Sequence, residues 1–283
     1  MDHYYLLGTP IAHSLSPAMM NYSFGKLGVN ARYDLMETDE EHLAAAVERL
    51  KEEGAKGWNV TMPCKQAMSA LCDELSTQSL IGGSVNTVKN DNGKLTGYTT
   101  DGIGLTHALS RASVSIKGES VTLLGTGGAA CAILIQAALE GAANISVFAN
   151  RPASFSRVRG LAERIAEYSD SCIRIFTYED PSVLKEELRK SRILIQATNV
   201  GMESGRSGNK DCLIPDESFL HPDLFVYDII YHPAKTPLLE MAERSSVRAE
   251  NGLSMLLGQG EESFRIWTGL KMPLDDLVRD LFH

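Results

Sequence analysis

The chain has 283 residues, of which 43% are hydrophobic, and a formal net charge of -9 at pH 7. This length suits two domains better than a single core, and the acidic charge argues against nucleic acid or an anionic membrane surface as the main partner. We expect no signal peptide, no membrane helix and no metal site, because the seven histidines are scattered. The five cysteines form no C-x-x-C pair, which indicates reduced thiols in a cytoplasmic protein.

The first part of the chain alternates short apolar strands with helices. Strands are predicted at residues 4–7, 31–37 and 57–61, and a hairpin around residues 90–93. Helices are predicted at residues 16–28, at residues 38–54, where a capping box at 38–41 marks the start, and at residues 65–75. Ser16 before Pro17 is typical of an N-cap. The alternation predicts an α/β domain.

A glycine-rich turn lies between a predicted strand at residues 121–124 and an apolar helix that stops at Gly141. A second strand at residues 145–149 follows, and the turn, Gly125-Thr126-Gly127-Gly128-Ala129-Ala130, fits G-x-G-x-x-[G/A]. Gly125 permits the tight turn, Gly127 lets the backbone approach a pyrophosphate, and Ala130 lets the helix pack closely. The N–H groups of the helix N-terminus then face the phosphates. This stretch predicts a Rossmann-type dinucleotide-binding domain.

The end of the second strand bears on the choice of cofactor. NAD-specific sites carry an acidic residue there, whereas this chain has Asn150 and Arg151 and no acid before Glu163. An arginine can bind the 2′-phosphate of NADP, and a carboxylate would repel it. We therefore expect NADP, with NAD as the alternative if Arg151 is only a solvated surface residue.

The rest of the chain continues this alternation and ends in two helices. Helices are predicted at residues 153–168, 181–190, from 236, 254–268 and 273–282, strands at 172–177, 192–196 and 224–230, and a mobile loop at 203–212. The last two helices have no strand of their own, so we expect them to return to the first domain. The prediction is a catalytic, substrate-binding domain at 1–102, completed by 253–283, and a Rossmann domain at 103–252, with hinges near 102 and 253.

Two charged residues at strand ends are candidates for proton transfer. Lys65 could take a hydroxyl proton while hydride leaves carbon, and Asp101 could pair with it; His13 is the rival proton carrier. A solvated lysine is the alternative, because most lysines are exposed. Several hydroxyl and amide side chains suit a small polyol substrate, namely Ser14, Ser16, Thr61, Asn86 and Gln259.

Several segments together resemble one family, the shikimate dehydrogenases, over essentially the whole chain. They are Ser14-Leu15-Ser16-Pro17, Asn59-Val60-Thr61-Met62-Pro63-Cys64-Lys65, Val85-Asn86-Thr87, Thr100-Asp101-Gly102, the Gly125–Ala130 turn and Gln259-Gly260. The N-V-T-x-P-x-K run is the most specific of them. The late segment from Gly252 to Gly269 looks most like the shikimate/quinate dehydrogenase branch.

The resemblance implies reversible oxidation of shikimate to 3-dehydroshikimate with NADP or NAD, in aromatic amino acid and chorismate biosynthesis. It implies that Lys65 exchanges the C3 hydroxyl proton, while Asp101 orients Lys65 and binds the neighbouring hydroxyl. It places Ser14 and Ser16 at the substrate carboxylate with Tyr231 nearby, and Thr61, Asn86 and Gln259 at the ring hydroxyls. The implied cofactor residues are Gly125, Thr126, Gly127, Gly128, Ala129, Asn150, Arg151, Thr198, Met202 and Gly252.

The chain departs from the family pattern after the second cofactor strand. NADP-specific members tend to carry Asn-Arg-Thr-x-x-Arg/Lys, and here the run is Asn150-Arg151-Pro152-Ala153-Ser154-Phe155. One basic residue of that clamp remains. The dual-cofactor branch often has an acid near position 153, which is alanine here, so an NAD-favouring group is missing as well.

Two other functions stay open. One is an enzyme that acts mainly on quinate, whose extra C1 hydroxyl needs room beside Ser14 and Ser16. The other is a non-catalytic nucleotide- or metabolite-sensing paralogue, against which the intact Lys65 and Asp101 argue. Exposed edge strands would allow a homodimer without requiring one. Cys64, next to Lys65, is either a reactive thiol or a packed, inert one.

Overall fold

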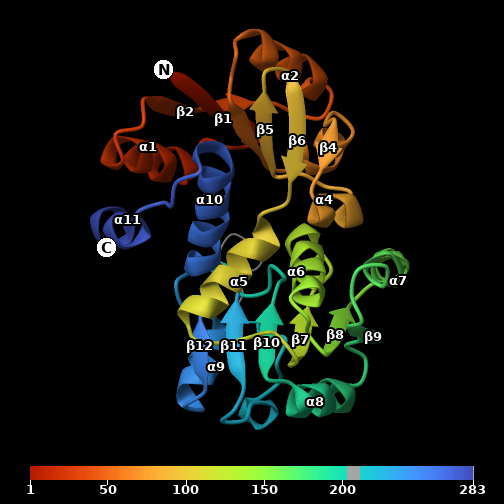
Figure 1. Ribbon diagram of the computed structural model, residues 1–283. Coiled ribbons are helices and arrows are strands. Elements are labelled where there is room, and N and C mark those ends of the chain that lie inside the picture. Colours follow the sequence, from red (N-terminus) through yellow and green to blue (C-terminus); the bar gives the residue numbers. More distant parts are fainter. Residues whose placement is uncertain (203–210, 283) are drawn as a thin grey trace. The chain divides into compact units, whose positions relative to one another are not determined.

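The computed structural model describes residues 1–202 and 211–282 and divides into two compact units. Unit 1 comprises Met1–Gly104 and Leu257–His283, and unit 2 comprises Leu105–Leu256 (Figure 1). The hinges expected near residues 102 and 253 lie close to these breaks. Most of the loop expected at 203–212 lies outside the described residues.

Unit 1 is built on a mixed sheet with the order β2-β1-β3-β5-β6-β4. Its strands are β1 (Asp2–Gly8), β2 (Ala31–Glu37), β3 (Gly57–Val60), β4 (Glu74–Leu75), β5 (Thr87–Asp91) and β6 (Lys94–Tyr98). β1 runs parallel to both β2 and β3, while β5 is antiparallel to β3 and β6. The β5–β6 hairpin turns at Asn92 and Gly93, both with positive φ (55° and 99°), as an Asn-Gly turn favours.

The helices of unit 1 include the C-terminal part of the chain. They are α1 (Ser16–Lys26), α2 (Leu43–Glu52), α3 (Lys65–Ser69), α4 (Thr77–Gly82) and α11 (Leu274–Leu281), with the start of α5 (Asp101–Arg111) and most of α10 (Leu253–Thr268). In α10, the Trp267 ring lies 4.8 Å from the Tyr4 ring and Phe264 lies 5.2 Å from Phe24. α11 is joined to α1 by the Tyr22 hydroxyl, which donates to Asp280 at 2.6 Å. The expected return of the last two helices to the first domain is confirmed.

Unit 2 contains a fully parallel sheet with the order β12-β11-β10-β7-β8-β9. Its strands are β7 (Ser120–Leu124), β8 (Asn144–Ala149), β9 (Cys172–Thr177), β10 (Ile193–Gln196), β11 (Phe225–Asp228) and β12 (Arg248–Glu250). The chain winds outward from β7 to β9 and then returns to β10 beside β7. This order reversal is the switch point at which open α/β sheets bind ligands, and it confirms the predicted Rossmann-type fold.

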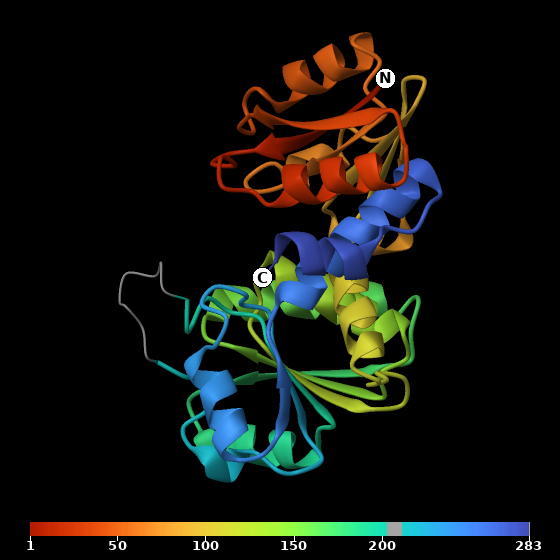
Figure 2. The same ribbon diagram turned by 90° about the vertical axis from the view of Figure 1, so that its left-hand side faces the viewer.

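Helices cover both faces of the unit 2 sheet (Figure 2). They are α6 (Gly128–Leu139), α7 (Pro152–Ile165), α8 (Pro181–Lys190) and α9 (Pro237–Arg244), with a short 3₁₀ turn at Glu217–Phe219. α8 and α9 pack on one face through Leu184, Leu188 and Leu238. Among the described residues, no helix is both long and apolar enough to cross a membrane.

The helix predicted from Lys65 to Leu75 is wrong in length, because α3 ends at Ser69. Asp73 explains the difference: its backbone N–H donates to the Leu95 carbonyl at 2.9 Å, and its carboxylate accepts from the Leu95 N–H at 2.7 Å. These bonds attach the chain to β6 and start β4. Pairing with a neighbouring strand therefore overrides the local helical pattern.

Two predicted helix caps are also wrong. Ser16 is the first helical residue of α1, the cap position is Leu15 with helical φ and ψ, and no side chain caps the helix. The capping box predicted at residues 38–41 does not form. Asp39 accepts a hydrogen bond from the His42 N–H at 3.0 Å, and α2 starts at the next residue, Leu43. The serine of α1 is thus not used as a helix cap.

Candidate active site and nucleotide pocket

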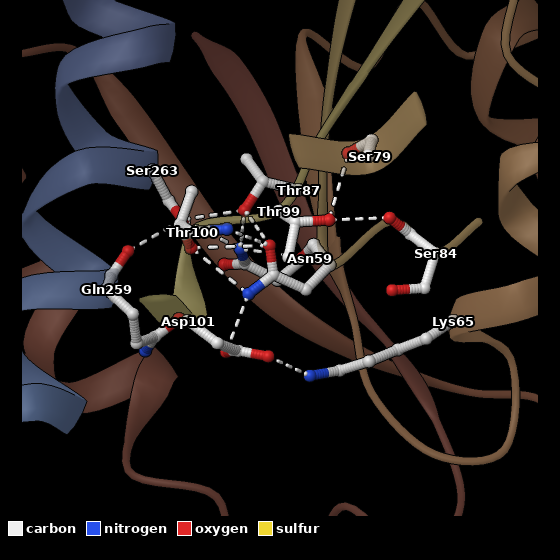
Figure 3. A network of polar contacts seen from close by, with 11 residues as sticks. Asn59, Lys65, Ser79, Ser84, Thr87, Thr99, Thr100, Asp101, Gln259 and Ser263 are labelled. Carbon is white, nitrogen blue, oxygen red and sulfur yellow. Dashed lines mark hydrogen bonds and ion pairs between the residues drawn. The ribbon is translucent and has the colours of Figure 1, made fainter. Parts of the chain in front are cut away.

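The side chains of Lys65 and Asp101 form an ion pair in unit 1, with Nζ 2.6 Å from Oδ2. Lys65 is the first residue of α3 and Asp101 the first of α5, so each follows the loop after a strand of the unit 1 sheet. The side chains are 29% and 17% exposed, respectively. Figure 3 shows Lys65 reaching toward Asp101 from the opposite side of the site. The pair is partly shielded, yet open enough for a substrate to reach it.

Asn86 fixes the orientation of the Asp101 carboxylate. Its side-chain amide donates to Asp101 Oδ1 at 2.8 Å, so the two carboxylate oxygens have separate partners. Its own oxygen accepts from the Thr100 N–H at 2.9 Å. Asn86 is buried, and its amide cannot turn without breaking these bonds. The carboxylate is therefore held in one position relative to Lys65.

A buried polar network extends from this pair into the core of unit 1 (Figure 3). The Asn59 amide donates to Thr87 Oγ1 and to Ser263 Oγ, each at 3.0 Å. Its oxygen accepts from the Tyr33 hydroxyl at 2.8 Å. Burial raises the pKa of Tyr33, and a hydrogen bond with the Ser16 side chain acts against it. Tyr33 is therefore a protonated donor at neutral pH, linking the Asn59 network to Ser16.

The loops after β1 and β3 carry the other predicted substrate residues of unit 1. The Thr61 N–H donates to the Leu7 carbonyl at 2.8 Å, and the Thr9 N–H donates to the Met62 carbonyl at 3.1 Å. These bonds join the loop that bears Ser14 and Ser16 to the loop that bears Thr61 and Lys65. Ser14, Ser16, Thr61 and Gln259 are all partly exposed.

Two further candidates of the sequence are Tyr231 and His13. Tyr231 lies in unit 2, 45% exposed, and lines the pocket described next. His13 is exposed in the loop after β1. Cys64 is fully buried with its thiol 3.5 Å from the Thr38 carbonyl, and burial raises its pKa. The packed, inert alternative for Cys64 is therefore the one that its surroundings favour.

A pocket of ≈ 880 Å³ opens in unit 2 after β7, β8, β10 and β11. The residues predicted for the cofactor line it, with the exception of Gly252. Gly125 has φ +114°, and a Cβ there would lie 2.7 Å from the Ala197 carbonyl oxygen, so only glycine fits. No atom lies within 4 Å of a Cβ built at Gly127 or Gly128, which leaves the N-terminus of α6 open. This cradle fits a pyrophosphate.

Gly252 supports the pocket from behind instead of lining it. A Cβ at this position would lie 1.9 Å from the Ile229 carbonyl oxygen. Its N–H donates to the Ile230 carbonyl at 3.0 Å. Since Ile229 and Ile230 line the pocket, Gly252 sets their position through close backbone packing.

A buried carboxyl group joins the two segments that form one wall of the pocket. Asp228, with no exposed surface, accepts from Thr236 Oγ1 at 2.6 Å and from the Ile230 N–H at 3.1 Å. The Gln196 amide donates to Asp228 and, at 3.0 Å, to the Val200 carbonyl. Burial raises the pKa of Asp228 to about 6, against its hydrogen bonds. Sequence reasoning missed this group.

The charged residues of the pocket are basic. Arg151 and Arg157 both line it, and no carboxylate does so among the described residues. Arg151 is the N-cap residue of α7. Sequence reasoning missed Arg157, because the family pattern has its second basic residue at position 155. Within the described residues, no group of His, Cys, Asp and Glu side chains is arranged to hold a metal ion.

Comparisons with known proteins identify relatives over the whole chain. The model of the shikimate dehydrogenase substrate binding domain matches residues 6–88, and that of the shikimate 5′-dehydrogenase C-terminal domain matches residues 252–279. A shikimate dehydrogenase (NADP(+)) of Listeria monocytogenes serotype 4b is 41% identical over 277 residues, which cover 98% of this chain and 94% of the relative.

Solved structures agree with this. A shikimate 5-dehydrogenase from Listeria monocytogenes, in complex with shikimate and NAD, has a TM-score of 0.95 at 40% identity and covers 100% of this chain and 96% of its own. The enzyme from Thermus thermophilus, in complex with NADP(H) and shikimate, has a TM-score of 0.82 at 30% identity, with 99% and 98% covered.

Proposed function

Since the chain belongs to the shikimate dehydrogenase family, we propose that it catalyses the reversible, NADP-dependent oxidation of shikimate to 3-dehydroshikimate. The observation that carries the proposal is the Lys65–Asp101 ion pair of 2.6 Å at the strand ends of unit 1. The similarity to the curated relative covers the segments that hold both residues. A protein that only senses a metabolite has no need of a proton carrier held in this way.

In the proposed reaction, Lys65 exchanges the proton of the C3 hydroxyl as the carbonyl forms. A bound nicotinamide cofactor would supply the acceptor for the hydride that leaves the same carbon. Asp101 keeps the Lys65 side chain in place and accepts a hydrogen bond from the neighbouring hydroxyl of the substrate. Asn86 prevents the carboxylate from rotating. Such positioned acid–base groups contribute about 10² to 10⁴ in rate.

Substrate recognition is proposed for the polar side chains around this pair. Ser14 and Ser16 would donate hydroxyl hydrogen bonds to the substrate carboxylate. Thr61 and Gln259 would contact the ring hydroxyls. The same contact stays a prediction for Asn86, whose buried amide is bonded to Asp101 and Thr100. The role of Tyr231 near the carboxylate stays a prediction. Neither serine is enlarged, so quinate, with its extra hydroxyl, is a second substrate to be tested.

NADP is proposed as the preferred cofactor because Arg151 lines the pocket and a 2′-phosphate needs a cation. The curated relative from Listeria monocytogenes is named for NADP. The related structure in complex with NAD makes NAD the comparison that a kinetic test has to include.

The test is a steady-state rate matrix of shikimate and quinate, each with NADP and NAD, for the parent enzyme and two lysine variants. Lys65→Ala should lower kcat by at least about 10² and leave NADP binding intact. Lys94→Ala is the matched control, since Lys94 makes an exposed ion pair of equal length, 2.6 Å, with Glu74 in the same unit. Unchanged turnover of Lys65→Ala would contradict the mechanism. No turnover by the parent, with tight nucleotide binding, would favour the sensor.

A cytoplasmic location and a homodimer also stay predictions. All five cysteines lie in the described part of the chain, and each is a free thiol, as expected in a reducing compartment. Cell fractionation and light scattering of the purified protein test these two points.

A further inference from the structure

The nucleotide pocket is locally basic in an acidic chain. The formal net charge is -9, which repels a polyphosphate cofactor at long range. Arg151 and Arg157 nevertheless line the same pocket, and no carboxylate lines it among the described residues. Two cations in one nucleotide pocket exceed what a neutral ribose hydroxyl requires. They fit a phosphate monoester, which offers several anionic oxygens to guanidinium groups.

The start of α7 brings the two arginines to the same pocket. Arg151, Ser154 and Arg157 follow each other at intervals of three residues, and all three line the pocket. Ser154 and Arg157 are neighbours on the helix surface, and Arg151 is the N-cap residue directly before the helix, with extended backbone angles. Val158 and Leu161 are buried, at 1% and 2% exposure, so the apolar side of α7 is fixed against the unit and its rotation is set. Ser154 and Arg157 are therefore held toward the pocket, which Arg151 also lines.

The surroundings of Cys131 place the Arg157 charge near α6. Burial raises the pKa of the Cys131 thiol, and the charges of Arg157 and Arg164 act against it. Cys131 lies in the first turn of α6, with its thiol 3.6 Å from the Thr126 carbonyl of the glycine turn. The Arg157 charge thus acts on a thiol in the first turn of α6.

We propose that Arg157 is a specificity-determining residue, which binds the 2′-phosphate of NADP together with Arg151 and the Ser154 hydroxyl. It replaces the basic side chain that the family pattern has at position 155, where this chain has Phe155. The proposal rests on the proposed function only in its choice of cofactor. NAD carries a hydroxyl in place of this phosphate, so Arg157 distinguishes the two cofactors.

The test compares Arg157→Ala, Arg157→Lys and Arg151→Ala with Arg159→Ala in the complete enzyme. Arg159 is exposed on the same helix but does not line the pocket, and residues two apart do not face each other. With saturating shikimate, Arg157→Ala should lose about tenfold to thirtyfold in kcat/KM for NADP and little for NAD. Arg157→Lys should recover part of that loss, because it keeps the charge without the planar fork. Arg159→Ala should match the parent.

A binding measurement separates this proposal from the proposed function. Titration calorimetry with adenosine 2′,5′-bisphosphate and with adenosine 5′-monophosphate needs no turnover. The parent should prefer the bisphosphate, and Arg157→Ala should lose about tenfold of that preference. An equal preference in Arg157→Ala and Arg159→Ala would overturn the proposal, whether or not the enzyme oxidises shikimate. So would a parent that binds both nucleotides equally.

Discussion

The buried carboxyl group of Asp228 makes the stability of unit 2 depend on pH in a direction opposite to that of most aspartates. Replacing it by asparagine keeps the shape and an acceptor for the Ile230 N–H, but removes the charge. In the parent, burial raises the pKa of Asp228 from 3.8 to about 6. As the pH rises, the unfolded chain therefore loses this proton before the folded one. The stability that the protonated group supplies is full below pH 3.8 and is lost as the pH rises through about 6.

The size of the effect follows from linkage. One pKa unit corresponds to about 1.4 kcal/mol, so a rise from 3.8 to about 6 lowers the unfolding free energy at neutral pH by about 3 kcal/mol. Asparagine leaves the Thr236 hydroxyl without its carboxylate acceptor, which costs about 1 kcal/mol. Asp228→Asn should then stabilise unit 2 by about 2 kcal/mol at pH 7.5. Its advantage should shrink by about 1 to 2 kcal/mol at pH 5.

Native-state hydrogen exchange of the β10 and β11 amides measures this locally, after correction for intrinsic rates. Both tryptophans, Trp58 and Trp267, lie in unit 1. Tryptophan emission during urea unfolding therefore reports unit 1 and serves as an internal control. Subtracting parent from variant at each pH cancels the titration of all other groups.

A second variant should change stability in the opposite direction. Thr236→Val removes the donor that favours the ionised carboxylate, at 2.6 Å. It should destabilise unit 2 more at pH 7.5 than at pH 5, because only the charged form loses a strong hydrogen bond. The reasoning is refuted if the difference between Asp228→Asn and the parent is the same at both pH values.

Three further perturbations test the packing, the polar network and the thiols. Gly252→Ala places a Cβ 1.9 Å from the Ile229 carbonyl oxygen, so it should destabilise unit 2 by about 3 kcal/mol or more; a Tm within about a degree of the parent would contradict this. Tyr33→Phe removes the donor to Asn59 and should lower kcat more than it raises KM for shikimate, whereas a change in stability alone would make the bond merely structural. Cys172, the one exposed cysteine of the five, should react first with Ellman's reagent, because burial raises the pKa of the other four thiols. A faster reaction of any of those four thiols would contradict this.

The fold class could be predicted because most elements bury an apolar face. Ala31–Glu37 and Cys172–Thr177 were predicted with the observed bounds, since a strand flanked by polar turns is delimited by composition alone. The short strands β4 and β12 were missed. They have two and three residues, too few for a period, and exist only because a neighbouring strand offers backbone partners.

The candidate site could be predicted where side chains follow a strand directly. Parallel register fixes the ends of neighbouring strands at one edge, as Gln196 pairs with both Leu124 and Asp228. A residue just after such an end has little freedom in where it lies. Lys65 and Asp101 meet for a related reason, although their roles stay a prediction. The buried links of Asn59 to Tyr33 and Ser263 join residues far apart in sequence, which no local pattern reveals.

A side chain further along a helix reaches a pocket only if the helix is rotated correctly, and that rotation is set by what the helix buries. In α7, the buried side chains of Val158 and Leu161 set this rotation. The family pattern has its second basic residue at position 155. This chain has a phenylalanine there without loss of the second cation, because Arg157 lines the same pocket as Arg151. The three-residue spacing was visible in the sequence. Its meaning depends on the buried face, so the choice between NADP and NAD follows from how the helix packs rather than from any single motif position.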